Sequence, residues 1–153
     1  MLNYYSKFIK NYATIVNPLY KLLQKNVKWD WSPECENAFS NAKNSLKSRE
    51  VLTFYNPNLP IKVTCDASPT GVGAVISHIL HDKSERPIAF ASRSLSTAEK
   101  NYSQLDKEAL ALIFGVKKFH QYIFGRHFTL ETDHKPLVYI FGNKKGIPQV
   151  AAS

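Results

Sequence analysis

The sequence predicts an α/β protein, with one mixed β-sheet, a crossover helix and a small helical segment in front. Three observations predict this class. Apolar and polar residues alternate over residues 61–66, and turn residues and a second strand-like run follow. Residues 103–123 carry apolar side chains at intervals of three and four, as amphipathic helices do. Another strand-like run, residues 128–132, comes soon after it.

The composition is that of a globular protein with a basic charge balance. The 153 residues are 44% hydrophobic and 21% charged, which is enough apolar material for a real core. Lys and Arg number 20 against 12 Asp and Glu, so the formal net charge of +8 favours a polyanionic partner. No apolar run is long enough to span a bilayer, and no signal peptide is visible. Cys35 and Cys65 fit no zinc motif and are expected to be reduced thiols.

Apolar residues recur at helical spacing over residues 2–25 and predict one broken helix or two short helices. Pro18 marks the break, because proline disfavours helical geometry at the preceding residue and suits the start of a helix. Single lysines of this segment are interpreted as part of a solvated helix face rather than as nucleic-acid contacts.

A longer helix is expected to begin at Pro33, with Ser32 as its N-cap. Trp29 and Trp31 are expected to wedge this helix against the next part of the chain. Residues 49–55 are predicted to carry a short strand.

The turn residues at 56–60 are interpreted as a linker, and the domain boundary is placed there. Residues 1–58 are expected to form the helical segment, and residues 59–153 the sheet domain. Short loops connect the first three strands of that domain, so they are expected to form an antiparallel meander. These strands are predicted at residues 61–66, 71–80 and 86–92.

The crossover helix is predicted to begin near Ser103, where Asp106 completes a variant of the capping box. Its apolar stripe runs to Ile123, and Gly125 is expected to end the helix in the left-handed conformation.

The strand at 128–132 is expected to pair in parallel with the first strand, because a connection of this length suits a crossover. That pairing would bring Asp66 and Asp133 together at the carboxyl ends of the two strands. Residues 135–141 predict a short helix, and residues 143–153 show no strong pattern.

Glu108 could join the two aspartates, because it lies one residue off the apolar stripe of the crossover helix. Converging acids repel one another unless cations are bound. Two divalent ions can activate water and neutralise the leaving oxygen in phosphodiester cleavage. The residues alone leave an alternative open, in which each Asp opens a turn and Glu108 is solvated.

Several motifs occur in an order that resembles the ribonuclease H domain of gypsy-type LTR-retrotransposon Pol polyproteins, the reverse transcriptase/RNase H family. The N-terminal part resembles the thumb and connection segment that precedes this domain, so the resemblance covers almost the whole chain. The motifs are residues 64–76, 88–95, 99–103, 107–111 and 132–137.

The resemblance implies an RNase H-like fold and metal-dependent endonucleolytic hydrolysis of the RNA strand of RNA/DNA hybrids. It implies that Asp66, Glu108 and Asp133 are catalytic and hold Mg²⁺, or Mn²⁺ in its place. The family's fourth acid follows a last strand and helix beyond Ser153, so the two-ion site is expected to be incomplete, as is the fold. The polymerase aspartates lie upstream of Met1, and no polymerase activity is expected.

The partners implied are an RNA/DNA hybrid and the rest of a Pol polyprotein, namely polymerase palm and fingers and integrase. The implied location is the cytoplasm or a virus-like particle, with no membrane partner. Nucleic-acid contacts are expected from Arg93, Tyr102, His134 and Lys135, which flank the site. Packing for Tyr102 and helix capping for His134 are the alternatives. Two other functions stay open: a catalytically dead remnant that binds nucleic acid or another Pol chain, and an unrelated α/β domain.

Overall fold

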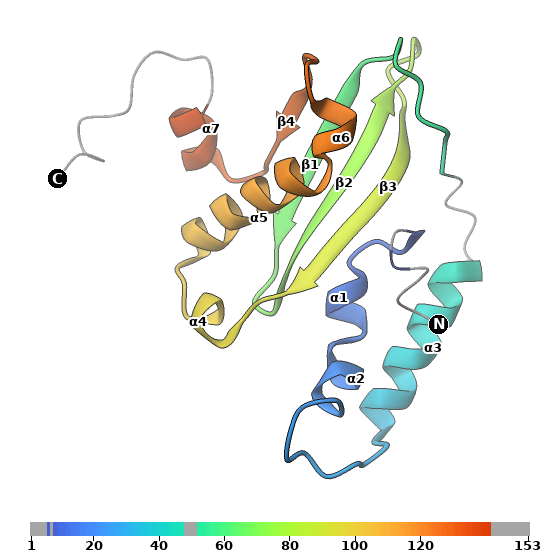
Figure 1. Ribbon diagram of the computed structural model, residues 1–153, viewed down its shortest axis with the longest axis vertical. Helices are drawn as coiled ribbons and strands as arrows, with labels where there is room; N and C mark the ends of the chain where they lie inside the picture. Colours follow the sequence, from blue (N-terminus) through green and yellow to red (C-terminus); the bar gives the residue numbers. More distant parts are fainter. Residues whose placement is uncertain (1–5, 7, 48–51, 142–153) are drawn as a thin grey trace, which may run out of the picture.

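The computed structural model describes residues 6, 8–47 and 52–141, and its elements are labelled in Figure 1. The helical segment contains the helices α1 (Tyr12–Ile15), α2 (Asn17–Lys21) and α3 (Pro33–Lys47). The strands are β1 (Ile61–Ala67), β2 (Gly71–Ile79), β3 (Glu85–Ser94) and β4 (Thr129–Glu131). The remaining helices are α4 (Thr97–Lys100), α5 (Gln104–Lys118), α6 (His120–Ile123) and α7 (Lys135–Phe141).

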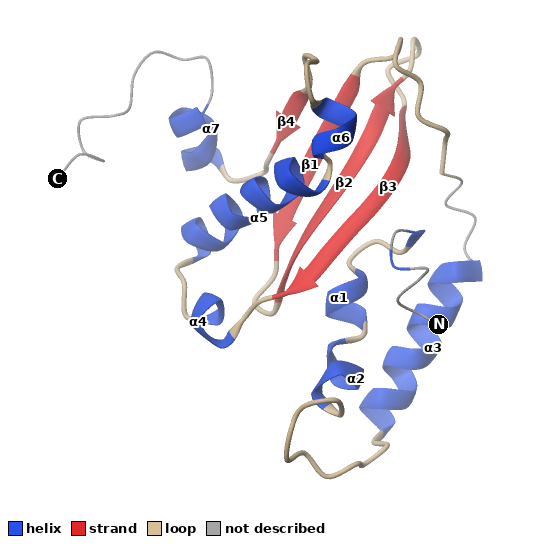
Figure 2. Cartoon of the chain, viewed as in Figure 1, coloured by secondary structure: helices blue, strands red, loops and turns tan. Residues whose placement is uncertain are grey.

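The four strands form one mixed sheet in the order β3-β2-β1-β4 (Figure 2). Strands β1, β2 and β3 make the expected antiparallel meander, and β4 pairs in parallel with β1. The predicted fold class is therefore confirmed. Strand β3 is longer than expected, because it pairs with β2 along its whole length through an irregularity between Ile76 and Ser77.

Helix α5 covers one face of the sheet. Every second side chain of β1 is buried and packs in the core beneath this helix. Gly115 lies so close to the sheet that a Cβ there would sit 2.4 Å from Cys65 Sγ and 3.2 Å from Ala74 Cβ. The glycine therefore lets the helix approach β1 and β2 directly. The main hydrophobic core fills this interface, with Val63 and Ile76 fully buried.

The helical segment packs on the opposite face. Residues 73 and 74 point to opposite faces of β2, and a Cβ on Gly73 would meet Asn11, whereas Ala74 lies under α5. The Ala13 backbone N–H donates to Ser92 Oγ at 2.9 Å, which ties α1 to β3. A second core joins α1 to α3 through residues that include Tyr12, Val16 and Ala42.

Several local predictions hold, since α3 begins at Pro33, α5 begins after Ser103 and α7 spans residues 135–141. The Ser103 hydroxyl accepts from the Asp106 N–H. A capping box that was not predicted occurs at Ser96 and Glu99, before α4.

Four local predictions are wrong in part. Among the described residues before Tyr12, Ser6 and Phe8 lie in 3-10 helix and the others in bends or turns, not in an α-helix, and residues 52–55 form no strand. Helix α5 ends at Lys118, and α6 follows after Phe119 leaves helical geometry at φ −100° and ψ 16°. Gly125 has the expected positive φ of 69°, but it lies beyond α6 rather than at the end of one long helix.

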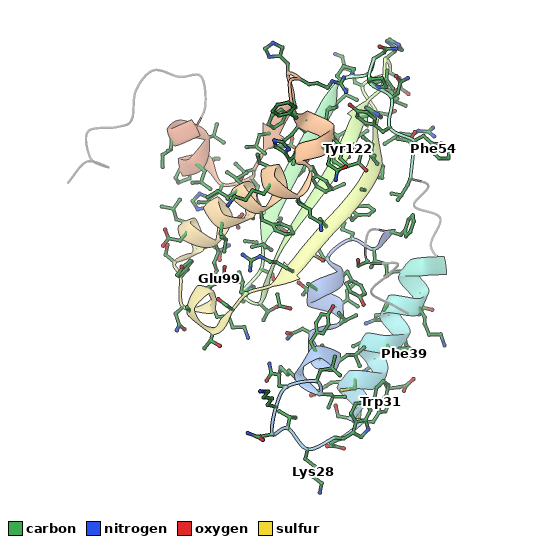
Figure 3. All side chains as sticks on the ribbon, viewed as in Figure 1. Lys28, Trp31, Phe39, Phe54, Glu99 and Tyr122 are labelled. Atoms are coloured by element: carbon green, nitrogen blue, oxygen red, sulfur yellow. The ribbon has the colours of Figure 1, made fainter. Side chains whose placement is uncertain are left out.

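The two tryptophans do not wedge α3 against the sheet. Trp29 and Trp31 are 65% and 43% exposed and stack on each other at a ring distance of 6.2 Å. Trp31 also packs its edge on Phe39 and donates to Glu36 Oε2 at 2.7 Å. Figure 3 shows Trp31 at the end of α3 away from the sheet and Phe39 further along that helix.

The predicted residues 49–51 of the short strand and the patternless residues 143–153 lie outside the described residues. The boundary between residues 1–58 and 59–153 stays a prediction. Within the part of the chain that the structure describes, no helix is both long and apolar enough to cross a membrane. Cys35 and Cys65 are both free and buried.

Candidate functional site

Asp66 lies one residue before the end of β1, exposed between the buried residues Cys65 and Ala67. The turn that follows holds the strand end in place. The Ser68 N–H donates to the Gly71 carbonyl oxygen at 2.8 Å, and the Gly71 N–H donates to Ser68 Oγ at 2.9 Å. A rigid turn thus presents the Asp66 carboxylate at the sheet surface.

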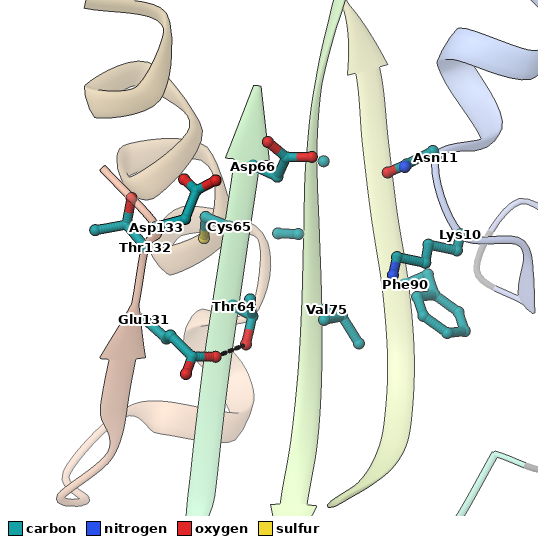
Figure 4. Close-up of a pocket in the computed structure, with 12 residues that line it drawn as sticks. Lys10, Asn11, Thr64, Cys65, Asp66, Val75, Phe90, Glu131, Thr132 and Asp133 are labelled. Carbon is teal, nitrogen blue, oxygen red and sulfur yellow. Dashed lines mark hydrogen bonds between the residues drawn. The ribbon is translucent and has the colours of Figure 1, made fainter. Parts of the chain in front are cut away.

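Asp133 reaches the same edge through the parallel pairing of β4 with β1. The register pairs Thr64 with Glu131, the last residue of β4, and Asp133 follows Glu131 by two residues, just as Asp66 follows Thr64. Both line one pocket of about 370 Å³ (Figure 4). Glu131 is neutralised there, since Lys62 Nζ lies 2.8 Å from its Oε2 and the Thr64 hydroxyl donates to the same oxygen.

Glu108 is 5% exposed, in the second turn of α5. Gln104 Nε2 donates to Glu108 Oε1 at 2.7 Å, and among the described atoms Glu108 Oε2 is buried without a hydrogen-bond partner. Burial raises the pKa of the Glu108 carboxyl, and the charges of Asp66 and Asp133 raise it further, against the Gln104 hydrogen bond. The three predicted acids therefore interact electrostatically.

The three carboxylates are suitable ligands for a hard divalent cation, but their present arrangement is not that of a formed metal site. Carboxylate oxygens are the ligands that Mg²⁺ prefers. The partnerless Oε2 of Glu108 and the mutual repulsion of the acids are features that a cation would relieve. Among the described residues, no group of three His, Cys, Asp or Glu side chains stands at metal-binding distances. The metal role of these acids stays a prediction.

The four predicted nucleic-acid contacts differ in their surroundings. Arg93 makes a bidentate ion pair with Glu99. Its guanidinium donates two hydrogen bonds to the Glu99 carboxylate, both at 2.8 Å. Tyr102 is 46% exposed, and Lys135 is also exposed. The His134 N–H donates to Thr132 Oγ1, and its Nδ1 is buried without a partner in the described structure. Their predicted roles stay predictions.

The sequence did not point to Lys10 and Asn11, which line the same pocket from the helical segment. Figure 4 shows them on the side of β3, across the pocket from Glu131 and Asp133. Their only sequence signal was a position in a basic segment, and the lysines there were interpreted as solvated.

Comparison with known families decides the classification. Residues 31–130 match the model of the RNase H-like domain found in reverse transcriptase. The chain belongs to this family. The match begins two residues before α3 and ends within β4; it includes Asp66 and Glu108, whereas Asp133 lies three residues beyond its end.

Two relatives of this RNase H-like chain are retrotransposon polyproteins. It is 37% identical over 139 residues to the retrovirus-related Pol polyprotein from transposon 412 of Drosophila melanogaster, covering 91% of this chain. The Tf2-3 polyprotein of Schizosaccharomyces pombe is also 37% identical over 139 residues, covering 90% of this chain. The chain spans 11% of the first polyprotein and 10% of the second.

Solved structures share the fold of this RNase H-like chain. The foamy viral protease-reverse transcriptase in complex with dsDNA matches with a TM-score of 0.70 at 18% identity, over 98% of this chain and 32% of that one. The same enzyme in complex with an RNA/DNA hybrid gives 0.68 at 19% identity, over 97% and 21%. Because these matches cover nearly the whole chain, the shared fold includes the helical segment.

Proposed function

We propose that the chain is the nuclease part of a retrotransposon reverse transcriptase and hydrolyses the RNA strand of RNA/DNA hybrids with divalent metal ions. The observation that carries this proposal is one pocket lined by Asp66 on β1 and Asp133 just beyond β4, whose charges both act on Glu108, a buried glutamate with a partnerless oxygen. The family and the foamy viral neighbour in complex with an RNA/DNA hybrid support it.

Each acid has a distinct part in this proposal. Asp66 on β1 and Asp133 just beyond β4 would hold Mg²⁺, or Mn²⁺. Gln104 occupies one oxygen of Glu108 and leaves the other as the available ligand. Bound ions supply an activated water and charge neutralisation at the leaving oxygen. The exposed Tyr102 and Lys135 are proposed to contact the hybrid, along with Arg93 and His134.

The test is a gel assay in which the RNA strand of the hybrid is labelled. We expect cleavage that needs Mg²⁺ or Mn²⁺, stops in EDTA, and falls about 10²–10⁴-fold in Asp66→Asn. Asp82→Asn is the matched control, because Asp82 lies in the hairpin loop after β2, at the other end of the sheet from Asp66. Equal rates in both variants would contradict the catalytic role of Asp66.

A second candidate is a non-catalytic chain that binds nucleic acid or another Pol chain. The formal net charge of +8 favours it, because phosphate contacts supply affinity whether or not the acids act. Salt-sensitive binding of the hybrid without metal-dependent cleavage would select this candidate.

A further inference from the structure

The pocket at Asp66 has two walls that come from distant parts of the chain. Glu131 and Asp133 stand on the β4 side, and Lys10 and Asn11 stand on the β3 side (Figure 4). The residues between them come from β1, β2 and β3 and include Thr64, Val75 and Phe90. The helical segment therefore completes a pocket whose acids lie on and beside the sheet.

Asn11 is fixed against the strand that flanks Asp66. Its backbone adopts the left-handed conformation, at φ 53° and ψ 31°, and its carbonyl oxygen accepts from the N–H groups of Thr14 and Ile15. A Cβ on Gly73 would lie 2.9 Å from Asn11 Oδ1, and Gly73 is the register partner of Asp66. The glycine thus admits the Asn11 carboxamide to the position opposite the carboxylate.

The charges in the pocket are divided between its two sides. Lys62 already neutralises Glu131, whereas Asp66 and Asp133 make no ion pair with any described residue. Lys10 on the facing wall also makes no ion pair within the described chain. The pocket therefore offers an anionic end that suits cations and a facing wall with an ammonium and a carboxamide, both of which can donate to an anion.

We propose that Lys10 and Asn11 bind a backbone phosphate of the nucleic acid, next to the phosphodiester that the carboxylate end receives. This inference rests on the proposed function and adds a second wall to its substrate site. Lys10 supplies a point charge, and Asn11 donates a neutral hydrogen bond, so the contact positions the strand without reading its sequence. The pocket volume of about 370 Å³ lies at the small end of ligand sites, which suits one backbone unit.

The test measures the affinity of a labelled RNA/DNA hybrid by fluorescence anisotropy over a series of salt concentrations, in EDTA so that no cleavage occurs. We expect Lys10→Gln to weaken binding and to reduce the slope of log affinity against log salt by about one, as loss of one phosphate contact does. Lys10→Arg should keep the slope. Asn11→Gly removes the carboxamide, and glycine adopts the left-handed backbone of this position readily. This variant should bind more weakly, with an unchanged slope of log affinity against log salt.

Lys28→Gln is the matched control, because it removes the same charge from an exposed lysine that Figure 3 places at the far end of the helical segment. It should leave the slope unchanged. Equal effects of Lys10→Gln and Lys28→Gln, with normal binding by the unaltered chain, would overturn this inference alone. Failure of the unaltered chain to bind the hybrid would overturn the proposed function as well.

Discussion

Thr64 and Glu131 are register partners across the parallel strands β1 and β4, and the Thr64 hydroxyl donates to the Glu131 carboxylate at 2.9 Å. This contact joins the two strands at the last residue pair of their register. A shift of the register by one residue would turn the side chains of β4 to the other face of the sheet relative to β1, and would displace Asp133, two residues beyond β4, from Asp66. The register of a three-residue strand therefore decides whether the two aspartates share one pocket.

Glu108→Gln should stabilise the metal-free chain at neutral pH. The pKa of Glu108 is raised above its unfolded value of 4.5, mainly by burial. Its favourable contribution is therefore complete below that value and is lost as pH rises through the folded-state pKa. Urea unfolding in EDTA should show the gain of the variant at neutral pH and its disappearance below pH 4.5.

Addition of Mg²⁺ should reverse this order, because a bound cation stabilises the ionised carboxylate only in the unaltered chain. If the variant and the unaltered chain have the same stability at every pH, burial does not raise the pKa of Glu108 and this prediction is wrong.

Glu99→Gln should destabilise the attachment of α4 to β3. The Arg93 guanidinium, together with the Ser96 N–H, lowers the pKa of Glu99 to about 2 from 4.5. The stabilisation is therefore present above pH 4.5 and is lost as pH falls through about 2. Thermal melts across this range should show a lower midpoint for the variant that converges with the unaltered chain in acid. A difference in melting midpoint that stays the same at every pH would contradict the contribution of the ion pair.

Gly115→Ala should destabilise the fold by about 1–3 kcal/mol, because overpacking strains a close-packed interface. The added Cβ would lie 2.4 Å from Cys65 Sγ. Cys65→Ala removes that sulfur, so the double variant should lose less stability than the sum of the two single variants. Urea denaturation of all four proteins completes the cycle, and strict additivity would show that the Cys65 contact is not the cause.

His78→Phe should destabilise the chain by about 1–3 kcal/mol, because it removes both hydrogen bonds of a fully buried imidazole and leaves the Asn56 N–H without its partner. The fully buried His78 accepts from the Asn56 N–H at 2.9 Å through Nε2, so Nδ1 carries the proton toward the Pro60 carbonyl oxygen at 3.2 Å. Hydrogen exchange at the Asn56 amide should accelerate. The same substitution at the exposed His81 is the control, and equal losses at both positions would refute the anchoring role.

Local sequence signals predicted the elements that depend on neighbours along the chain. Alternation predicted the first strand, short loops predicted the antiparallel meander, and the Ser103 cap predicted the start of α5. Asp66 and Asp133 could be paired from sequence because a crossover helix leaves few ways to join two strands. The same local signals failed at Phe119, where an apolar stripe continues although the backbone leaves the helix.

By itself, then, the sequence determined the order of the four strands of the sheet, the parallel pairing of β1 with β4 and the three acids of the candidate site. Only the tertiary structure decided that α1 packs against β3, and thus that Lys10 and Asn11 stand across the pocket from Asp133. It also left Trp29 and Trp31 exposed. The physical reason is that periodicity reports which face of a helix or strand is apolar, whereas the partner of that face depends on contacts between residues far apart in the chain.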